Sequence, residues 1–244
     1  MMARGCVQPR RGFLHLTAAT GTALLLAGAG GSLVAPGRGL GMVWAQDQGQ
    51  GEEVSANEDL MREHGILNRV LLVYEEGLRR LDGQQEVDPA VLNSAAGLIR
   101  RFVEDYHERT EENYLFPRFQ QAGTLVDLVT VLQQQHDAGR RVTDRILALA
   151  TTDGLRDPTS RQALADSIRQ FIRMYRPHEA REDTVLFPAF HKLLSPDEYD
   201  ALGDQFEDRE RQMFGGDGFD MARDQVQALE QQLGIYDLAQ FTPA

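Results

Sequence analysis

One thirteen-residue segment occurs twice in the chain and constrains the fold more than any other feature. Residues 107–119 read HERTEENYLFPRF, and residues 178–190 read HEAREDTVLFPAF. Both fit the pattern H-E-x-x-E-[ED]-x-x-L-F-P-x-F. Residues four positions apart lie one above the other on an α-helix, so each copy places an imidazole and a carboxylate side by side. Each copy therefore predicts one half of a metal site carried on a helix.

The repeat extends to two further histidines, each upstream of one copy. His64 and His136 are 72 residues apart, and the two copies are offset by 71. All four histidines fall at positions flanked by apolar turns, where a buried polar group costs several kcal/mol unless something compensates it. A single such histidine is usually an ordinary core residue, but four in a repeat indicate ligands. The candidate ligands are His64, His107, Glu111, His136, His178 and Glu182.

The ligand types restrict the metal. The only cysteine, Cys6, lies in the N-terminal segment, so no thiolate is available. Imidazole and carboxylate ligands without thiolate disfavour structural zinc and fit iron or manganese. Four histidines and two glutamates are too many for one ion and suit two, bridged by Glu111 and Glu182. We expect His64 and His107 to serve one ion, and His136 and His178 the other.

Several neighbouring residues have two interpretations. Glu108 and Glu179 each precede a bridging glutamate by three residues and can turn toward the metals; a solvated helix surface is an equally good interpretation. Tyr74 and Tyr175 lie near the level of the histidines, where core packing with a satisfied hydroxyl is favoured over a bond to a metal-bound ligand. We expect His191 at the surface. Phe116, Pro117, Phe119 and their copies should close one end of the fold.

Four long segments have apolar residues at alternating spacings of four and three, which is typical of bundle helices. We expect helices over 55–83, 88–117, 125–154 and 157–189, with Gly83, Pro117 and Gly154 as ends and a kink at Pro177. Strand signals are absent and the loops are short, so the sequence predicts an all-α, antiparallel up-down four-helix bundle. Two further helices, to about 213 and over 219–233, should pack on the bundle or on another subunit.

The first 45 residues predict a twin-arginine export signal. Arg10-Arg11-Gly12-Phe13-Leu14 precedes an apolar run, and Val43-Trp44-Ala45 resembles a cleavage site. Glycines and Pro36 interrupt the run before it reaches the roughly 20 apolar residues of a membrane-spanning helix. The expected division is a signal over 1–45, a linker over 46–56, a bundle over 57–194 and a helical extension over 195–244. We expect an exported, periplasmic protein that is folded around its cofactor before export.

The charge of the expected mature chain argues against two classes of partner. Residues 1–45 hold four arginines and no acidic residue, so 21 basic and 37 acidic residues remain, a net charge of −16. Such a surface argues against binding to nucleic acid or to an anionic membrane.

With these motifs, the sequence resembles the bacterial hemerythrin-like (HHE cation-binding) proteins from about Asn57 to its end. The resemblance implies an up-down four-helix bundle that holds a non-haem di-iron centre, with the six candidate residues as ligands. One departure stands out. Oxygen-carrying members have a second histidine one turn beyond that of the third helix, where this chain has Arg140, and a longer gap before the last carboxylate. The site therefore has one histidine fewer, which puts simple oxygen carriage in doubt.

The resulting hypothesis is an exported di-iron protein, monomeric or a small homo-oligomer, that binds oxygen, nitric oxide or peroxide. Two alternatives stay open. One is a di-iron enzyme that reduces peroxide or oxidises a substrate, although the sequence contains no reductase domain and no electron-carrier motif. The other is a protein that stores or scavenges iron.

Overall fold

The computed structural model describes residues 54–243, so the expected export signal and its cleavage site lie outside the described residues. Residues 54–243 belong to one compact unit. Within this range every regular element is a helix, which confirms the predicted all-α class. None of the described helices is both long enough and apolar enough to cross a membrane.

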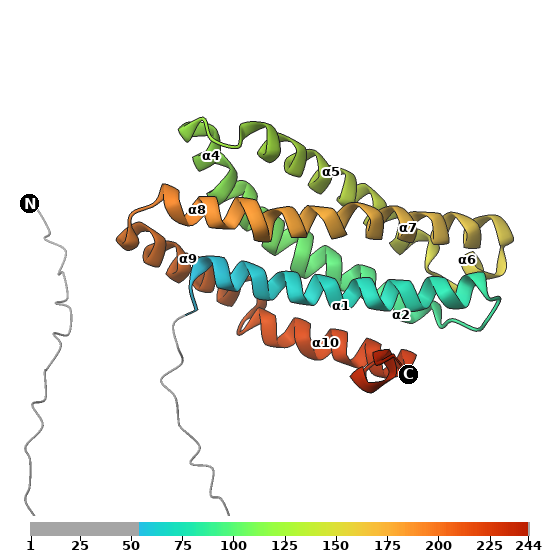
Figure 1. The fold of residues 1–244 in the computed structure, drawn as a ribbon. Helices are drawn as coiled ribbons and strands as arrows, with labels where there is room; N and C mark the ends of the chain where they lie inside the picture. Colours follow the sequence, from blue (N-terminus) through green and yellow to red (C-terminus); the bar gives the residue numbers. More distant parts are fainter. Residues whose placement is uncertain (1–53, 244) are drawn as a thin grey trace, which may run out of the picture. The chain divides into compact units, whose positions relative to one another are not determined.

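Four helical rods lie side by side, and consecutive rods run in alternate directions (Figure 1). The first rod is α1 (Ala56–Asp82), and the third is α5 (Val126–Leu149). The second rod is continuous through α2 (Pro89–Leu98), η1 (Ile99–His107), α3 (Glu108–Thr110), η2 (Glu111–Leu115) and α4 (Phe116–Ala122). The fourth consists of α7 (Pro158–Arg181), η3 (Glu182–Leu186) and α8 (Phe187–Leu193), and the short α6 (Thr152–Arg156) connects it to the third.

Three of the predicted helix starts are confirmed by their caps. Ser55 accepts a hydrogen bond from the N–H of Glu58, and Asp88 and Asp157 accept from the N–H groups of Ala90 and Ser160. These side chains satisfy N–H groups that have no partner within the helix. Gly83 follows the end of the first rod, as expected.

Two predicted helix ends are wrong. The second rod continues past Pro117 to Ala122, because the wide turn of η2 lets the N–H of Phe116 reach the carbonyl of Glu111, five residues back. Proline is then tolerated in the first turn of α4, where its missing N–H has little effect. Gly154 does not close α5, which ends at Leu149. It lies within α6, where its N–H donates to the side chain of Thr151.

Both copies of the repeat contain this wide turn at the same place. In η3 the N–H of Phe187 bonds to the carbonyl of Glu182, and Pro188 follows in the first turn of α8. The π-helical segments η2 and η3 thus each begin at a glutamate of the candidate site and end just before the Phe-Pro pair. Pro177 lies inside α7; the kink expected there stays a prediction.

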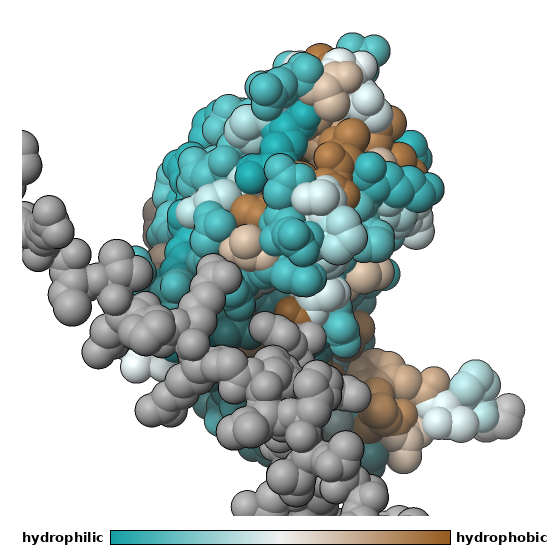
Figure 2. Space-filling view, turned by 90° about the vertical axis from the view of Figure 1, so that its left-hand side faces the viewer, coloured by the Kyte–Doolittle hydropathy of each residue, from teal (hydrophilic) through white to brown (hydrophobic). Residues whose placement is uncertain are grey.

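The core has two apolar clusters, separated by the level of the candidate ligands. One contains the aromatic rings of Tyr74, Phe102 and Phe171, and extends toward the α6 end. The other lies at the α4 and α8 end, where the phenylalanines of both L-F-P-x-F segments pack as expected. Figure 2 views that end of the molecule, where the residues left visible by the grey atoms are mainly hydrophilic.

The C-terminal extension packs on the first rod of the same chain. It consists of α9 (Pro196–Phe214), α10 (Gly218–Leu233) and η4 (Leu238–Phe241). Arg69 pairs with Glu230 at 2.5 Å, and the guanidinium of Arg62 lies 4.2 Å from the ring centre of Phe219. The expectation that these helices cover the bundle is therefore met within the chain.

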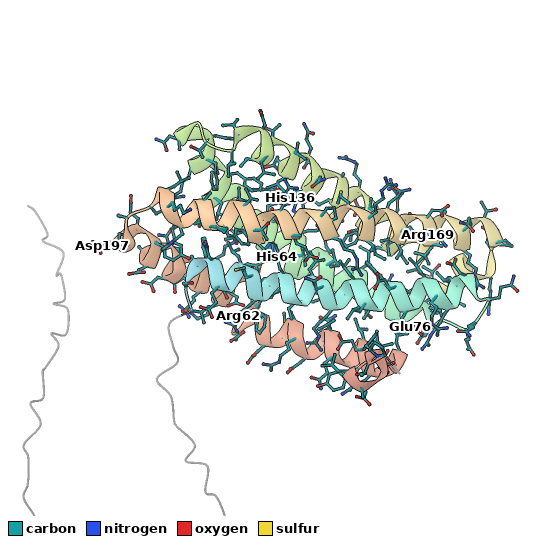
Figure 3. The ribbon with its side chains drawn as sticks, viewed as in Figure 1. Arg62, His64, Glu76, His136, Arg169 and Asp197 are labelled. Carbon is teal, nitrogen blue, oxygen red and sulfur yellow. The ribbon has the colours of Figure 1, made fainter. Side chains whose placement is uncertain are left out.

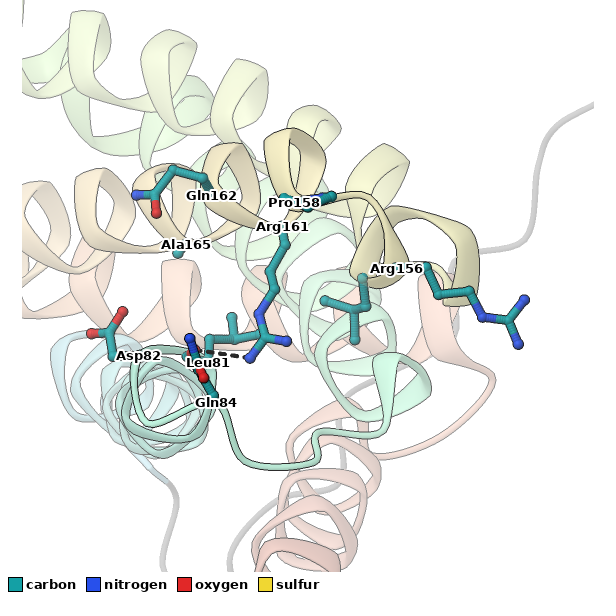
Figure 4. A pocket seen from close by; sticks show the side chains of 9 residues that line it. Leu81, Asp82, Gln84, Arg156, Pro158, Arg161, Gln162 and Ala165 are labelled. Atoms are coloured by element: carbon teal, nitrogen blue, oxygen red, sulfur yellow. Dashed lines mark hydrogen bonds between the residues drawn. The ribbon is translucent and has the colours of Figure 1, made fainter.

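The α6 end carries a groove of about 520 Å³ (Figure 4). Arg161 on α7 crosses it and donates to the carbonyl of Leu81 at 2.9 Å, which ties the fourth rod to the end of the first. The residues that line the groove include none of the candidate ligands.

Candidate metal centre

The structure brings all six candidate ligands together in one buried layer. His64 comes from α1, His136 from α5 and His178 from α7, and Figure 3 shows His64 and His136 at a similar level along the rods. His107 and Glu111 come from the second rod, and Glu182 from the fourth. Each of the six is at most 4% exposed. The spacing of these residues in the sequence, and their positions between apolar turns, therefore predicted the common layer in which they lie.

The histidines form two pairs with their Nε2 atoms face to face. The Nε2 atoms of His64 and His107 are 3.1 Å apart, and those of His136 and His178 are 3.2 Å apart. Two neutral imidazoles cannot both direct lone pairs at each other favourably, but a cation between the two rings accepts both lone pairs. The pairing is the one expected from the sequence.

The two glutamates lie between the pairs. Glu111 Oε2 is 3.7 Å from His107 Nε2 and 3.4 Å from His136 Nε2. Glu182 Oε2 is 3.2 Å from His178 Nε2 and 3.4 Å from His64 Nε2. Each carboxylate thus approaches one histidine of each pair, which is the position that a bridging ligand requires.

The glutamates also supply the observation that tests the fit of a metal. All four carboxylate oxygens of Glu111 and Glu182 are buried, and none has a hydrogen-bond partner among the described residues. Burial, together with the nearby charge of Glu182, raises the pKa of Glu111 well above its usual value. Buried carboxylates without donors are strongly unfavourable unless cations compensate them. Six convergent N and O donors without a thiolate fit two borderline cations such as iron.

Each imidazole is held from behind by a hydrogen-bond acceptor at its Nδ1 atom. His64 Nδ1 is 2.7 Å from Asp183, and His107 Nδ1 is 2.6 Å from Glu63. The corresponding distances from His136 to Glu112 and from His178 to Gln135 are 3.1 and 2.8 Å. An N–H that donates outward leaves the Nε2 lone pair facing the centre, as in metal-binding histidines.

These outer partners were missed by the sequence analysis, although the repeat contains a signal for them. Glu63 and Gln135 each directly precede the lone histidine of their hairpin, while Glu112 and Asp183 each directly follow a central glutamate. The [ED] position of the repeated pattern therefore has a role. The outward bonds were not evident, because they join residues of different rods.

The repeated phenylalanines orient two of the rings. Phe187 stacks on His64 and Phe116 on His136, with ring centres 5.4 Å apart in both pairs. Burial alone lowers the pKa of His64, but its hydrogen bond to Asp183 and the nearby charge of Glu182 raise it to about 9. Protons and cations therefore compete for this side chain.

Glu108 and Glu179 are buried, so their interpretation as solvated surface is wrong. Glu108 accepts a hydrogen bond from the hydroxyl of Tyr175 at 2.6 Å and pairs with Arg140 at 2.7 Å. Glu179 accepts from the amide of Asn68 at 3.0 Å. In this structure both carboxylates bond to protein groups, and a role for either as a ligand stays a proposal.

Arg140 lies beside the centre, where its guanidinium contacts Glu108 and Glu112 at 2.7 Å each. These two carboxylates and His136 form a third group with convergent ligand atoms, and the guanidinium supplies positive charge beside it. Arg140 therefore neutralises acids close to the centre.

The tyrosines and His191 were predicted with mixed success. The hydroxyl of Tyr175 is satisfied by Glu108, as favoured, but the buried hydroxyl of Tyr74 has no partner among the described residues. His191 is exposed, as expected, and packs against Tyr199.

The geometry agrees with the comparison against known families. The hemerythrin HHE cation binding domain matches residues 55–190 and, in a second overlapping match, 129–213. The chain belongs to the hemerythrin HHE cation-binding family. The second match of this hemerythrin-like protein begins within the second hairpin, as the internal repeat leads one to expect. Family membership implies that the protein binds metal ions.

The similar proteins add coverage along the whole chain. A protein of Mycobacterium bovis and proteins of two Mycobacterium tuberculosis strains are each 45% identical to it over 235 residues, which is 96% of this chain and 91% of the relative. Each of these relatives is described as an uncharacterized protein. No solved structure matches the chain.

Proposed function

We propose that this hemerythrin-like protein is an exported non-haem di-iron protein that binds oxygen or a related small ligand, nitric oxide or peroxide. In this proposal residues 57–194 form the four-helix bundle of the family. One observation carries the proposal: two face-to-face histidine pairs flank two buried carboxylates that have no donor among the described residues. Manganese would fit the same donors; the resemblance to proteins that hold a non-haem di-iron centre favours iron.

The number of protein donors supports the binding of a small ligand. Two imidazoles and two shared carboxylates would give each ion four protein donors, which leaves positions open as in other non-haem iron sites. Phe116 and Phe187 lie directly against the histidine rings, and apolar clusters lie on both sides of the layer. Such surroundings exclude water and favour a small, weakly polar ligand.

A second candidate, a di-iron peroxidase or oxidase, is supported by Arg140 and Tyr175. Arg140 occupies the position at which oxygen-carrying relatives have a second histidine. Its guanidinium is bonded to two carboxylates, so it does not serve as a metal ligand in place of that imidazole. The Tyr175 ring lies 5.5 Å from that of His178, and its hydroxyl is bonded to Glu108. The Tyr175 hydroxyl and the Glu108 carboxyl would be placed to move protons beside the centre, and the Arg140 guanidinium would hold Glu108 by its charge.

The deciding experiment is anaerobic reduction followed by exposure to oxygen while the visible spectrum is recorded. A reversible binder should take up one oxygen per iron pair, release it under vacuum and cycle without loss. An enzyme should show a decaying adduct and should consume peroxide with turnover when an electron donor is supplied. Iron loading far beyond two per chain would instead indicate storage. Absence of any spectral change with oxygen, in protein that contains two irons, would contradict the proposal.

A further inference from the structure

The outer hydrogen-bond partners of the two histidine pairs differ in charge. Behind the His64/His107 pair both partners are carboxylates, Asp183 at 2.7 Å and Glu63 at 2.6 Å. Behind the His136/His178 pair, one partner is the neutral amide of Gln135. The internal repeat makes this difference conspicuous, because Glu63 and Gln135 occupy equivalent positions, each directly before a lone histidine.

The remaining carboxylate of the second pair, Glu112, is shared among several donors. Its Oε1 atom lies 3.1 Å from His136 and also accepts from Arg140 at 2.7 Å and from Gln133 at 3.0 Å. Its Oε2 atom accepts from Arg109 at 2.6 Å. Two guanidinium groups thus compensate the charge of Glu112.

The partners of the first pair carry no such compensation. Among residues 54–243, no arginine lies within ion-pair distance of Glu63 or Asp183. Glu63 is only 2% exposed, and its second oxygen has no hydrogen-bond partner in that range. A carboxyl group that accepts from the Nδ1–H of an imidazole raises the basicity of its Nε2 toward a cation more than a neutral amide does, and loss of such partners typically lowers metal affinity by about 10- to 100-fold.

The second pair also adjoins a depression in the surface. A depression of about 180 Å³ lies between α5 and α7, and both Gln135 and His178 line it. Its other lining side chains are mostly apolar and include Leu132 and Pro177. His178, whose ring is held by the neutral amide of Gln135, is therefore also a histidine that a small molecule can approach from this depression.

We infer that the two metal sites hold their ions unequally, with the ion at His136/His178 exchangeable and the ion at His64/His107 firmly held, and that Glu63 and Gln135 set this difference. The inference rests on the proposed two-iron centre and goes beyond it by assigning the exchangeable site. Glu63 and Gln135 act as positioning residues, because they touch the imidazoles and not the metals.

The experiment follows the release of iron from the two-iron holoprotein after addition of an excess of a coloured ferrous chelator under reducing, anaerobic conditions. The wild type should lose its iron in two phases of one ion per chain each. The Gln135→Glu variant should slow the fast phase by about tenfold or more and leave the slow phase unchanged. The Glu63→Gln variant should accelerate the slow phase by a similar factor, so that both ions leave at comparable rates.

Two control variants separate local from general effects. Gln134→Glu adds the same charge at an exposed neighbouring position of α5 and should leave both phases as in the wild type. The double variant Glu63→Gln/Gln135→Glu keeps the net charge and should again give two phases. When His178→Ala is added to the double variant, the rate of the slow phase should change. When His178→Ala is made alone, the rate of the fast phase should change.

Release of both ions in a single phase from the wild type would overturn the inference, and so would a Gln135→Glu effect confined to the slow phase. In either case the protein still holds two irons, so the proposed di-iron function stands. Purified protein without two irons per chain would instead contradict the proposed function itself. If Gln135→Glu does not fold, the Glu63→Gln result decides the matter alone.

Discussion

At the scale of single residues, the account depends most on Glu111 and Glu182. Each approaches one histidine of each pair, and neither has another partner for its oxygens among the described residues. A bridging ligand serves both ions, whereas a histidine serves one. The consequences of removing the two ligand types should therefore differ in stoichiometry.

The Glu111→Ala and Glu182→Ala variants should each lose close to two irons per chain, while His64→Ala and His136→Ala should loosen mainly one. Elemental analysis after desalting measures this directly. Glu86→Ala, at an exposed position, is the matched control and should keep both ions. The iron-depleted variants should also unfold at lower temperature, because the cations bind only the folded chain. Unchanged metal content in both glutamate variants would remove them from the centre.

Gly139 gives a second prediction at this scale. A Cβ added there would lie 2.0 Å from the hydroxyl oxygen of Tyr175, which donates to Glu108. Gly139→Ala should displace Tyr175 and lower the free energy of unfolding by about 1–3 kcal/mol. Gly65→Ala is the control, since its Cβ meets nothing within 4 Å and alanine favours a helix by about 1 kcal/mol. Equal denaturant midpoints for the two variants would contradict this account of Gly139.

At the scale of elements, the C-terminal helices are held to each other and to the first rod partly through buried acids. Glu210 at the end of α9 is 9% exposed and accepts a hydrogen bond from the N–H of Phe219 at 2.7 Å. Burial raises its pKa to about 7, and the charge of Asp59 contributes to that increase. The folded chain therefore binds this proton more tightly than the unfolded chain, whose glutamate has its usual pKa near 4.5.

The pH dependence follows from that difference. The stabilisation by protonated Glu210 is complete below about pH 4.5 and is lost as the pH rises through 7. Glu210→Gln keeps an acceptor for Phe219 and removes the charge, so its stability advantage over the wild type should grow between pH 4.5 and 7. The full pKa difference corresponds to about 3 kcal/mol, and screening by solvent at this partly buried side chain reduces the expected gain to about 2 kcal/mol. Denaturant unfolding of both proteins at several pH values measures it. Asp208→Asn, exposed on the same helix, should show no such trend, and a constant difference for Glu210→Gln would contradict the role of burial.

At the scale of the whole molecule, the metal centre draws on all four rods. His64, His107, His136 and His178 each come from a different rod, so the ligands meet only when the chain is folded. A protein of this kind takes up its metals on folding. That order suits a route that exports folded proteins, which is the route predicted from Arg10 and Arg11.

Replacement of both Arg10 and Arg11 by lysine should therefore leave the protein in the cytoplasm with its metals bound. Fractionation of cells followed by immunodetection measures this. A variant with lysine at Arg38 alone, outside the twin-arginine motif, should be exported like the wild type. Undiminished export of the double-lysine variant would contradict the twin-arginine prediction.

Much of this architecture could be predicted from the sequence, because the repeat indicates where the ligands lie and the capping residues indicate where the helices begin and end. The spacing of histidine and glutamate gave the shared layer, and Asp88, Asp157 and Gly83 gave the helix limits. The π-helical turns before Pro117 and Pro188 could not be predicted, since a proline more often ends a helix than follows a widened turn. The outer bonds from Glu63 and Gln135 depend on how separate rods are packed, which local spacing does not specify.

The most direct test of the central claim is a crystal structure of the purified protein with anomalous diffraction recorded at the iron absorption edge. The account predicts two peaks in the buried layer, one beside His64 and His107 and the other beside His136 and His178. The carboxylates of Glu111 and Glu182 should lie between the peaks. A single peak, or a zinc signal in place of iron, would contradict the account.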